Sequence, residues 1–341
     1  MKLTFNQIKS ITQGAAEIVQ NDGNVVFYRF NKDERDVYNQ TEFCEKTAST
    51  SGVQMEFETD GDCLNLQIKT SEASSRTFFS MDIFVNGNCV SCIKNFDDTA
   101  KSSNYVSAKF KMGSFQKNVE LGSGSKTVRI VFPWSVAAEL VSIELEYATY
   151  VTPVSKNKSM FIYGDSIATG YDAMYSSASM SSQLANALNV ELFNKSIGGE
   201  IFRPELAKIK SDVAPSYILV AYGTNEFSRS EQSDFCQRCQ IFFDSLVCNY
   251  PEVPIFALTP IWRSDYDGER IFGKFEDVEN NIRKICSAHK NITVISAWDF
   301  VPHNQKYFSD LRLHPNDEGF EHYYNNLIEE IKKMIRCCQA K

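Results

Sequence analysis

The hydrophobic pattern changes once along this chain, after a polar connector at residues 152–158, and this change restricts the fold more than any other feature. Before the connector, apolar and polar residues alternate with a period of two. After it, continuous apolar runs alternate with segments of helical periodicity. Alternation indicates antiparallel sheets with one face towards water, whereas continuous runs between helices indicate a buried parallel sheet. The 341 residues therefore suit two domains of different class.

The first part of the chain, from about residue 14 to 150, contains many short alternating segments. Clear examples are residues 53–58, 64–69 and 143–147. Turn sequences rich in Asn, Asp and Gly separate the segments, at residues 21–23, 60–62, 86–88 and 122–124. We therefore expect an N-terminal all-β sandwich, similar to a jelly roll, over residues 1–152.

The second part, residues 153–341, contains four continuous apolar runs with helical patterns between them. The runs are residues 160–163, 217–220, 255–258 and 292–295. Strands buried on both faces have this pattern, and helical crossovers between them imply a parallel sheet. We expect a three-layer α/β domain with a central parallel sheet, on which a C-terminal helix packs with a stripe of apolar side chains: Phe320, Tyr324, Leu327, Ile331 and Met334.

The charge balance limits the partners that the chain can bind. It has 43 acidic and 35 basic residues, a formal net charge of −8. Such a surface lacks the basic character of proteins that bind nucleic acid or anionic membranes. No run approaches 18 apolar residues, and the N-terminus has no apolar run of the signal-peptide type. We expect a cytoplasmic protein that binds neither nucleic acid nor membrane; the sequence does not indicate its oligomeric state.

Ten cysteines include two pairs with CxxC spacing, Cys89/Cys92 and Cys236/Cys239. A structural zinc site needs four ligands on one tetrahedron. The first pair follows an expected hairpin turn and the second lies in a helical stripe, so we interpret them as structural thiols. A zinc hydrolase built on these pairs is the alternative; otherwise we expect no metal and no cofactor.

Polar residues follow the carboxyl ends of several runs, where open α/β sheets bind ligands. Ser166, Asn225 and Trp262 follow three of the runs, and Gly199 and His314 lie in loops at the same expected edge. A serine, a histidine base and donors for an oxyanion are sufficient for acyl transfer. The alternatives are that Ser166 caps a helix and that Asn225 closes a turn.

Four blocks in this order resemble the SGNH hydrolases of the GDSL esterase superfamily, over about residues 160–335. They are Gly164-Asp165-Ser166-Ile167, residues 194–199, Gly223-Thr224-Asn225-Glu226 and His314-Pro315-Asn316-Asp317. The resemblance implies Ser166 as the nucleophile and His314 as the base. It also implies an oxyanion hole formed by the backbone N–H groups of Ser166 and Gly199 and the side chain of Asn225. The absence of GxSxG around Ser166 argues against an α/β-hydrolase.

The spacing before the histidine departs from the family's pattern. The family usually has an aspartate three residues before the histidine, whereas Asp310 lies four residues before His314 and Leu311 occupies the expected position. We expect Asp310 to orient His314 as the third member of a triad. The alternative is a main-chain carbonyl, as in the Ser–His dyads of some related carbohydrate esterases.

A β-sandwich followed by an SGNH domain resembles the bipartite carbohydrate esterases that remove O-acetyl groups from sugars. The resemblance implies a metal-independent serine esterase acting on small acyl esters, above all acetyl esters, of a carbohydrate or another small molecule. Candidate substrate contacts are Trp262, Tyr171 and Phe227. The alternatives are a lipase or thioesterase of the same superfamily, and a non-catalytic carbohydrate-binding protein with a decayed site.

Overall fold

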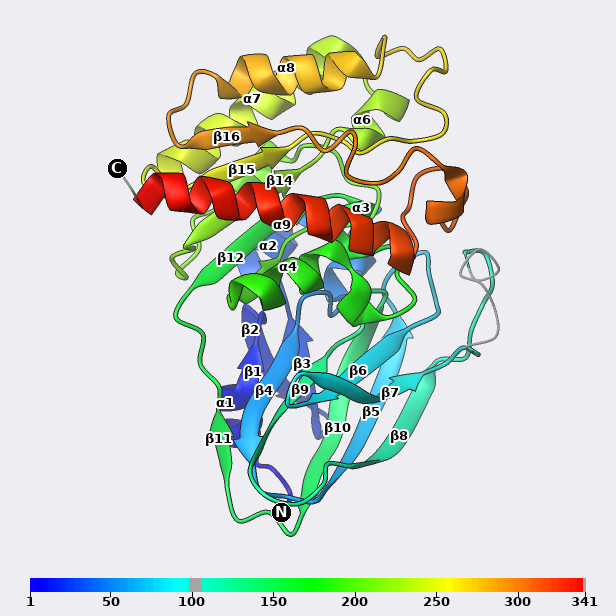
Figure 1. Cartoon of the computed structure of the whole chain (residues 1–341), viewed down its shortest axis with the longest axis vertical. Helices are drawn as coiled ribbons and strands as arrows, with labels where there is room; N and C mark the ends of the chain where they lie inside the picture. The colour runs from blue at the N-terminus through cyan, green and yellow to red at the C-terminus, as the bar shows by residue number, and fades with distance from the viewer. Residues whose placement is uncertain (98–105, 340–341) are drawn as a thin grey trace. The chain divides into compact units, whose positions relative to one another are not determined.

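The computed structural model describes residues 1–97 and 106–339, and the chain forms two compact units (Figure 1). The first comprises Met1–Asn157, Met174–Ser177 and Glu191–Asn194, and the second comprises Lys158–Ala173, Ala178–Val190 and Lys195–Lys341. Antiparallel sheets form the first unit and a parallel sheet forms the core of the second. The predicted order of an all-β sandwich followed by an α/β domain is confirmed.

Two antiparallel sheets make up the first unit. One has the strand order β1-β4-β9-β6-β7, with β11 paired to β4, and the other has the order β2-β3-β10-β5-β8. The strands are β1 (Thr12–Gln13), β2 (Glu17–Asn21), β3 (Asn24–Tyr28), β4 (Gln54–Thr59), β5 (Cys63–Glu72), β6 (Ser80–Val85), β7 (Asn88–Lys94), β8 (Gly113–Glu120), β9 (Lys126–Val131), β10 (Val136–Glu146) and β11 (Val151–Pro153). Apolar side chains of both sheets, such as Phe57 and Leu140, form one core. The alternating pattern follows from this arrangement because only one face of each strand is buried.

Helices in the N-terminal region depart from the purely β expectation. Helix α1 (Phe5–Ile11) precedes the first strand, and α2 (Lys32–Tyr38) lies inside the region predicted to be β. Asn31 accepts the N–H of Glu34 at 2.9 Å, and the Glu34 carboxylate accepts the N–H of Asn31 at 2.9 Å. This capping box satisfies two helix-end donors reciprocally and starts α2.

A parallel sheet forms the core of the second unit. Strands β12 (Ser159–Gly164), β14 (Tyr217–Ala221), β15 (Ile255–Leu258) and β16 (Ile292–Ile295) pair in parallel in that order. Within the described residues, β13 (Glu191–Asn194) completes a five-stranded sheet beside β12. Every residue of β12 and β15 is buried. Burial on both faces explains why these strands appear in the sequence as continuous apolar runs.

Helices cover both faces of the parallel sheet (Figure 1): α7 and α8 lie on one side, and α4 and α9 lie on the other. The helices of this unit are α3 (Ser166–Thr169), α4 (Met180–Leu188), α5 (Pro204–Ala207), α6 (Thr224–Arg229), α7 (Gln232–Asn249), α8 (Glu276–Cys286) and α9 (Asp317–Gln339). Helix α9 buries Phe320, Leu327 and Ile331 of its predicted stripe, whereas Tyr324 and Met334 are only half-buried. None of the helices among the described residues has the length and apolar character needed to cross a membrane.

Candidate active site

Ser166 is the first residue of α3 and lies directly beyond the carboxyl end of β12. The N-cap of this helix is Asp165, whose carboxylate accepts the N–H of Ile167 at 2.9 Å. A side chain at Gly164 would place its Cβ 2.8 Å from the carbonyl oxygen of Ala221, so glycine is required where the strand turns into the helix. The Ser166 hydroxyl is therefore not the helix cap, in contrast to the alternative drawn from the sequence.

A chain of hydrogen bonds links Ser166, His314 and Asp310. Ser166 Oγ lies 2.8 Å from Nε2 of His314, and Nδ1 of the same ring lies 2.8 Å from Oδ2 of Asp310. Burial by itself would raise the pKa of Asp310, but the hydrogen bond and charge of His314 outweigh burial and hold the pKa of this carboxyl well below its usual value. An ionised Asp310 can hold Nδ1–H and stabilise an imidazolium, which is the role of the acid in a Ser-His-Asp triad.

A left-handed residue accommodates the extra position between Asp310 and His314. Leu311 has a φ of +55°. Oδ1 of Asp310 accepts the N–H groups of Arg312, Leu313 and His314 at 3.0, 2.7 and 3.1 Å. Successive N–H groups of this kind form a concave site for an anion. One oxygen of Asp310 therefore folds the loop, while the other oxygen faces the imidazole.

The three predicted oxyanion donors lie on α3, on the loop after β13 and on α6. The N–H of Ser166 is the first of α3 and has no acceptor inside that helix. Gly199 has a φ of +88°, and its N–H makes no hydrogen bond within the described residues. Asn225 donates one N–H to the carbonyl oxygen of Glu200 at 2.9 Å. This bond fixes the carboxamide against the Gly199 loop, and its second N–H is the candidate donor to an oxyanion.

Glu226 joins the two loops that carry these donors. Its Oε1 accepts the N–H of Phe202 at 2.7 Å, and its Oε2 accepts the N–H of Gly223 at 2.9 Å. The side chain is 0% exposed, and burial raises the pKa of its carboxyl to about 8. The sequence offered no specific signal for Glu226 beyond its place after Asn225. Its two bonds set the separation of the loops that hold Gly199 and Asn225.

A second carboxylate, which the sequence did not reveal, faces the imidazole. Oδ2 of Asp172 lies 3.5 Å from Nδ1 of His314, and Asp172 is 0% exposed. Ligand atoms of Asp172, Asp310 and His314 lie within 4.8 Å of one another, a spacing that a cation could bridge. Within this group, however, Nδ1 of His314 is already bonded to Asp310, and we assign no metal to it.

Tyr171 packs on His314 and, within the described part of the chain, does not line an open pocket. Its ring stacks on the imidazole of His314, with 5.7 Å between centroids and an interplanar angle of 30°. A Cβ at Gly198 would lie 2.2 Å from the Tyr171 ring, so glycine is required for this packing. The family's glycine block therefore supplies one glycine for packing, Gly198, and one with a left-handed φ, Gly199.

The other two candidate substrate contacts occupy different environments. Trp262 is 9% exposed and stacks on His303 with 5.4 Å between centroids and an interplanar angle of 12°. Phe227 is fully buried and packs edge-on against Phe275. Both side chains are thus buried: Trp262 packs on His303, and Phe227 lies in the core.

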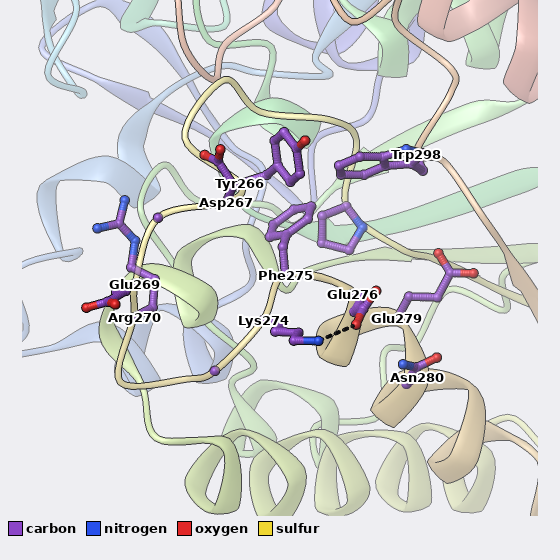
Figure 2. A pocket seen from close by; sticks show the side chains of 13 residues that line it. Tyr266, Asp267, Glu269, Arg270, Lys274, Phe275, Glu276, Glu279, Asn280 and Trp298 are labelled. Carbon is purple, nitrogen blue, oxygen red and sulfur yellow. Dashed lines mark hydrogen bonds and ion pairs between the residues drawn. The ribbon is translucent and has the colours of Figure 1, made fainter.

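A cavity of about 930 Å³ lies in the loop between β15 and α8 (Figure 2). Tyr266, Phe275 and Trp298 supply its aromatic walls, and an ion pair of 3.5 Å joins Lys274 to Glu276 at its rim. The triad residues do not line this cavity. The sequence did not predict it, because the loop has no periodic pattern.

Hydrogen bonds connect this cavity loop to the histidine loop. The N–H of Ser264 donates to the carbonyl oxygen of Arg312 at 3.0 Å, and the Arg312 guanidinium lies 3.3 Å from Asp265. Asp265 also pairs with the buried Arg263 at 2.6 Å. Burial alone would raise the pKa of Asp265, but Arg263 and Arg312 together lower it to about 2. An ionised network therefore ties the cavity loop to residues between Asp310 and His314.

The CxxC pairs lie on regular elements. Cys89 and Cys92 are on β7, whereas Cys236 and Cys239 are on α7. Burial raises the pKa of the Cys239 thiol well above its usual value. Zinc ligation requires the thiolate, so a buried and protonated Cys239 favours a structural role.

Comparisons with known proteins agree with this geometry. Residues 162–322 match the GDSL-like lipase/acylhydrolase family. No curated protein sequence matches the chain. Among solved structures, it is similar to the salicylyl-acyltransferase SsfX3 from a tetracycline biosynthetic pathway, with 18% identity and a TM-score of 0.78 over 95% of this chain and 94% of that one.

Two further solved structures share the fold of both units. A putative GDSL-like lipase from Bacteroides ovatus has 14% identity and a TM-score of 0.75, over 98% of each chain. A family two carbohydrate esterase from Cellvibrio japonicus has 16% identity and a TM-score of 0.66, over 97% of each chain. The match of residues 162–322 to the GDSL-like lipase/acylhydrolase family indicates an ester hydrolase domain in the second unit.

Proposed function

We propose that the chain is a serine esterase that removes small acyl groups, above all acetyl, from a carbohydrate ester. The observation that carries the proposal is the hydrogen-bonded chain from Ser166 through His314 to Asp310, with both contacts at 2.8 Å. Support for a carbohydrate substrate comes from proteins of similar fold, which include a family two carbohydrate esterase in complex with cellohexaose and an acetyl xylan esterase.

In the first half-reaction, Ser166 Oγ attacks the ester carbonyl carbon while its proton passes to Nε2 of His314. The carbonyl oxygen becomes an oxyanion, which accepts the N–H groups of Ser166 and Gly199 and the side-chain N–H of Asn225. Each such donor typically lowers the barrier by about 2.7–4 kcal/mol. The intermediate then breaks its bond to the leaving oxygen, which takes the proton from His314, so an alcohol departs and an acyl-enzyme remains.

In the second half-reaction, water takes the place of the alcohol. His314 accepts a proton from the water as its oxygen attacks the acyl carbon, and the same donors hold the new oxyanion. Collapse breaks the bond to Ser166 Oγ, which recovers its proton from His314, and the carboxylic acid leaves. The fold similarity to an acyltransferase over 95% of the chain favours one second candidate function, in which an acceptor alcohol replaces this water.

The cavity beside Tyr266 suits the part of a carbohydrate that does not react. Aromatic rings such as Tyr266 and Trp298 offer flat apolar faces, and Asp267 and Asn280 add polar groups at the rim. Its volume of about 930 Å³ lies within the ~300–1,000 Å³ range of small-molecule sites. Ser264 is two residues from Tyr266 and bonds to Arg312, which is two residues from His314. At about 3.6 Å per residue, the Tyr266 and His314 backbones lie within roughly 20 Å of each other.

An acyl-length series tests this proposal. The wild type would be assayed with p-nitrophenyl esters from acetyl to octanoyl and with acetylated oligosaccharides, and Ser166 would be labelled with a fluorophosphonate. We expect stoichiometric labelling, loss of labelling in Ser166→Ala, and the highest kcat/KM for acetyl. Absence of labelling would indicate a decayed binding protein, and a preference for long chains would indicate a lipase. A new ester formed with an added alcohol would indicate an acyltransferase.

A further inference from the structure

Asp172 lies on the segment that follows the nucleophile helix, and its carboxylate is directed at the catalytic histidine. It comes six residues after Ser166, and its Oδ2 lies 3.5 Å from Nδ1 of His314. Asp310 lies on the same side of the ring at 2.8 Å. Nδ1 of His314, which faces away from Ser166, therefore lies near two carboxylates, and each carboxylate comes from a different loop.

The backbone holds Asp172 in this position. The Ser309 hydroxyl donates to the carbonyl oxygen of Asp172 at 3.2 Å, which joins the nucleophile segment to the residue preceding Asp310. The N–H of Ala173 donates to the carbonyl oxygen of Gly170 at 3.1 Å and closes a turn around Asp172. Asp172 has a φ of +70°, a left-handed conformation that costs most residues energy and that glycine would adopt more easily. Glycine would fit this backbone conformation with less strain, but it would place no carboxylate beside the imidazole.

Two carboxylates lie at one edge of the His314 ring. The titratable groups that face His314 are Asp310 and Asp172 at Nδ1, Tyr171 stacked on the ring, and Asp165 through its charge. The fully buried Asp172 and the half-buried Asp310 place two carboxylates close together, and like charges repel less when a cation lies between them. The geometry therefore helps His314 to accept the proton of Ser166.

We propose that Asp172 is a second positioning residue of the catalytic histidine, which shares Nδ1–H with Asp310 and takes over that hydrogen bond when Asp310 is removed. The inference rests on the proposed role of His314 as the base. It explains how one extra residue in the Asp310 loop is tolerated, because orientation of the ring does not depend on Asp310 alone.

A double-mutant cycle tests the sharing. The wild type, Asp172→Asn, Asp310→Asn and the double variant would be compared in kcat, KM and the pH profile of kcat/KM with p-nitrophenyl acetate. Asp310→Asn alone is expected to lose about 10- to 100-fold in kcat, because Asp172 replaces it. The double variant is expected to lose about 10⁴-fold, the loss that follows when the base is held in the wrong tautomer. Asp172→Asn alone is expected to lose less than about tenfold in kcat, because Asp310 still holds the ring, so the combined loss exceeds the product of the single losses while KM changes little.

The pH profile distinguishes orientation from a structural role. Asp172→Asn removes a charge that stabilises the imidazolium, so the acid limb of kcat/KM is expected to move to lower pH. The matched control is Asp22→Asn, which removes the carboxylate of an exposed aspartate that also has a left-handed φ, +48°, and its acid limb is expected to coincide with that of the wild type. An unmoved limb in Asp172→Asn, or a double variant that equals the product of the single losses, would overturn the inference.

Two further measurements do not depend on the natural substrate, and one of them also checks that the variant is folded. The rate at which a fluorophosphonate labels Ser166 depends on the base and not on the natural substrate. An unlabelled wild type would reject the proposed function, whereas equal labelling rates in wild type and Asp172→Asn would reject this inference alone. In Asp310→Asn, a low-field proton resonance of Nδ1–H is expected to persist because Asp172 holds it. Its absence in a folded Asp310→Asn protein would contradict the sharing.

Discussion

Replacing Glu226 by Gln is expected to make the protein more stable than the wild type at alkaline pH. Glu226 is fully buried, and burial raises the pKa of its carboxyl from 4.5 to about 8. The unfolded chain releases this proton near pH 4.5, whereas the folded protein keeps it until about pH 8. Glu226 therefore contributes stability that is present in full below pH 4.5 and is lost as the pH rises through about 8. Since each pH unit corresponds to about 1.36 kcal/mol, the loss amounts to at most about 5 kcal/mol.

Gln does not titrate, so it removes this dependence, but its NH₂ group faces one of the two N–H groups that the carboxyl accepts. Urea unfolding of wild type and Glu226→Gln at pH 5, 7 and 9 would measure the difference in the free energy of unfolding. We expect the variant to be about 1–3 kcal/mol less stable than the wild type at pH 5, because one buried N–H loses its acceptor. At pH 9 we expect it to be about 1–3 kcal/mol more stable, because the wild type has by then lost most of the stability that the protonated carboxyl provides. Glu329→Gln, at an exposed position of α9, is the matched control and is expected to follow the wild type.

The opposite trend would refute this reasoning. If Glu226→Gln fell further behind the wild type as the pH rose, the carboxylate would be the native form. The N–H groups of Phe202 and Gly223 would then outweigh burial and keep Glu226 charged. A difference that did not change with pH would also contradict the expected proton uptake.

Three further substitutions test the proposed chemistry. Ser166→Ala is expected to abolish turnover while the circular dichroism spectrum is unchanged, since loss of an essential triad member costs up to about 10⁶ in kcat in a serine protease; more than a few per cent of residual activity would reject Ser166 as nucleophile. Asn225→Ala is expected to lower kcat by about 10²–10³ with little change in KM, and a change in KM alone would assign Asn225 to ground-state binding. Tyr266→Ala is expected to lower kcat/KM about tenfold for acetylated oligosaccharides and not for p-nitrophenyl acetate, because the aromatic wall contacts only the larger substrate. Ile271→Ala, exposed on the same loop, is its control, and equal losses on both substrates would argue against a sugar site there.

The fold was predictable from the sequence because the burial of each strand determines the pattern of its apolar residues. The four continuous runs correspond to β12, β14, β15 and β16, and the alternating segments correspond to strands such as β4 and β5. Period-two alternation indicates a strand buried on one face, and a continuous apolar run indicates a strand buried on both faces. This difference predicted the boundary between the two units. Helix α2 was missed because its signal is a local capping box at Asn31 and Glu34 within a region of β character.

The candidate site was only partly predictable, because its missing members have no pattern of their own. Asp172 is a single aspartate in a turn, and only the tertiary structure brings it to His314. Glu226 is distinguished by burial and by two backbone N–H groups, neither of which the sequence displays. The cavity at Tyr266 is formed by an irregular loop, whose conformation depends on distant partners such as Arg312.

The separate contacts of the two Asp310 oxygens have a consequence for how such a domain could evolve. Oδ1 organises the loop through three N–H groups, and Oδ2 serves the base. An asparagine can retain the first contact with its carbonyl oxygen while its NH₂ group faces Nδ1–H as a donor. A descendant with this single exchange would keep its loop, its ligand-binding surface and its serine, yet catalyse slowly. Loss of one negative charge at Asp310 would thus slow the proposed chemistry while the loop that Oδ1 organises is kept.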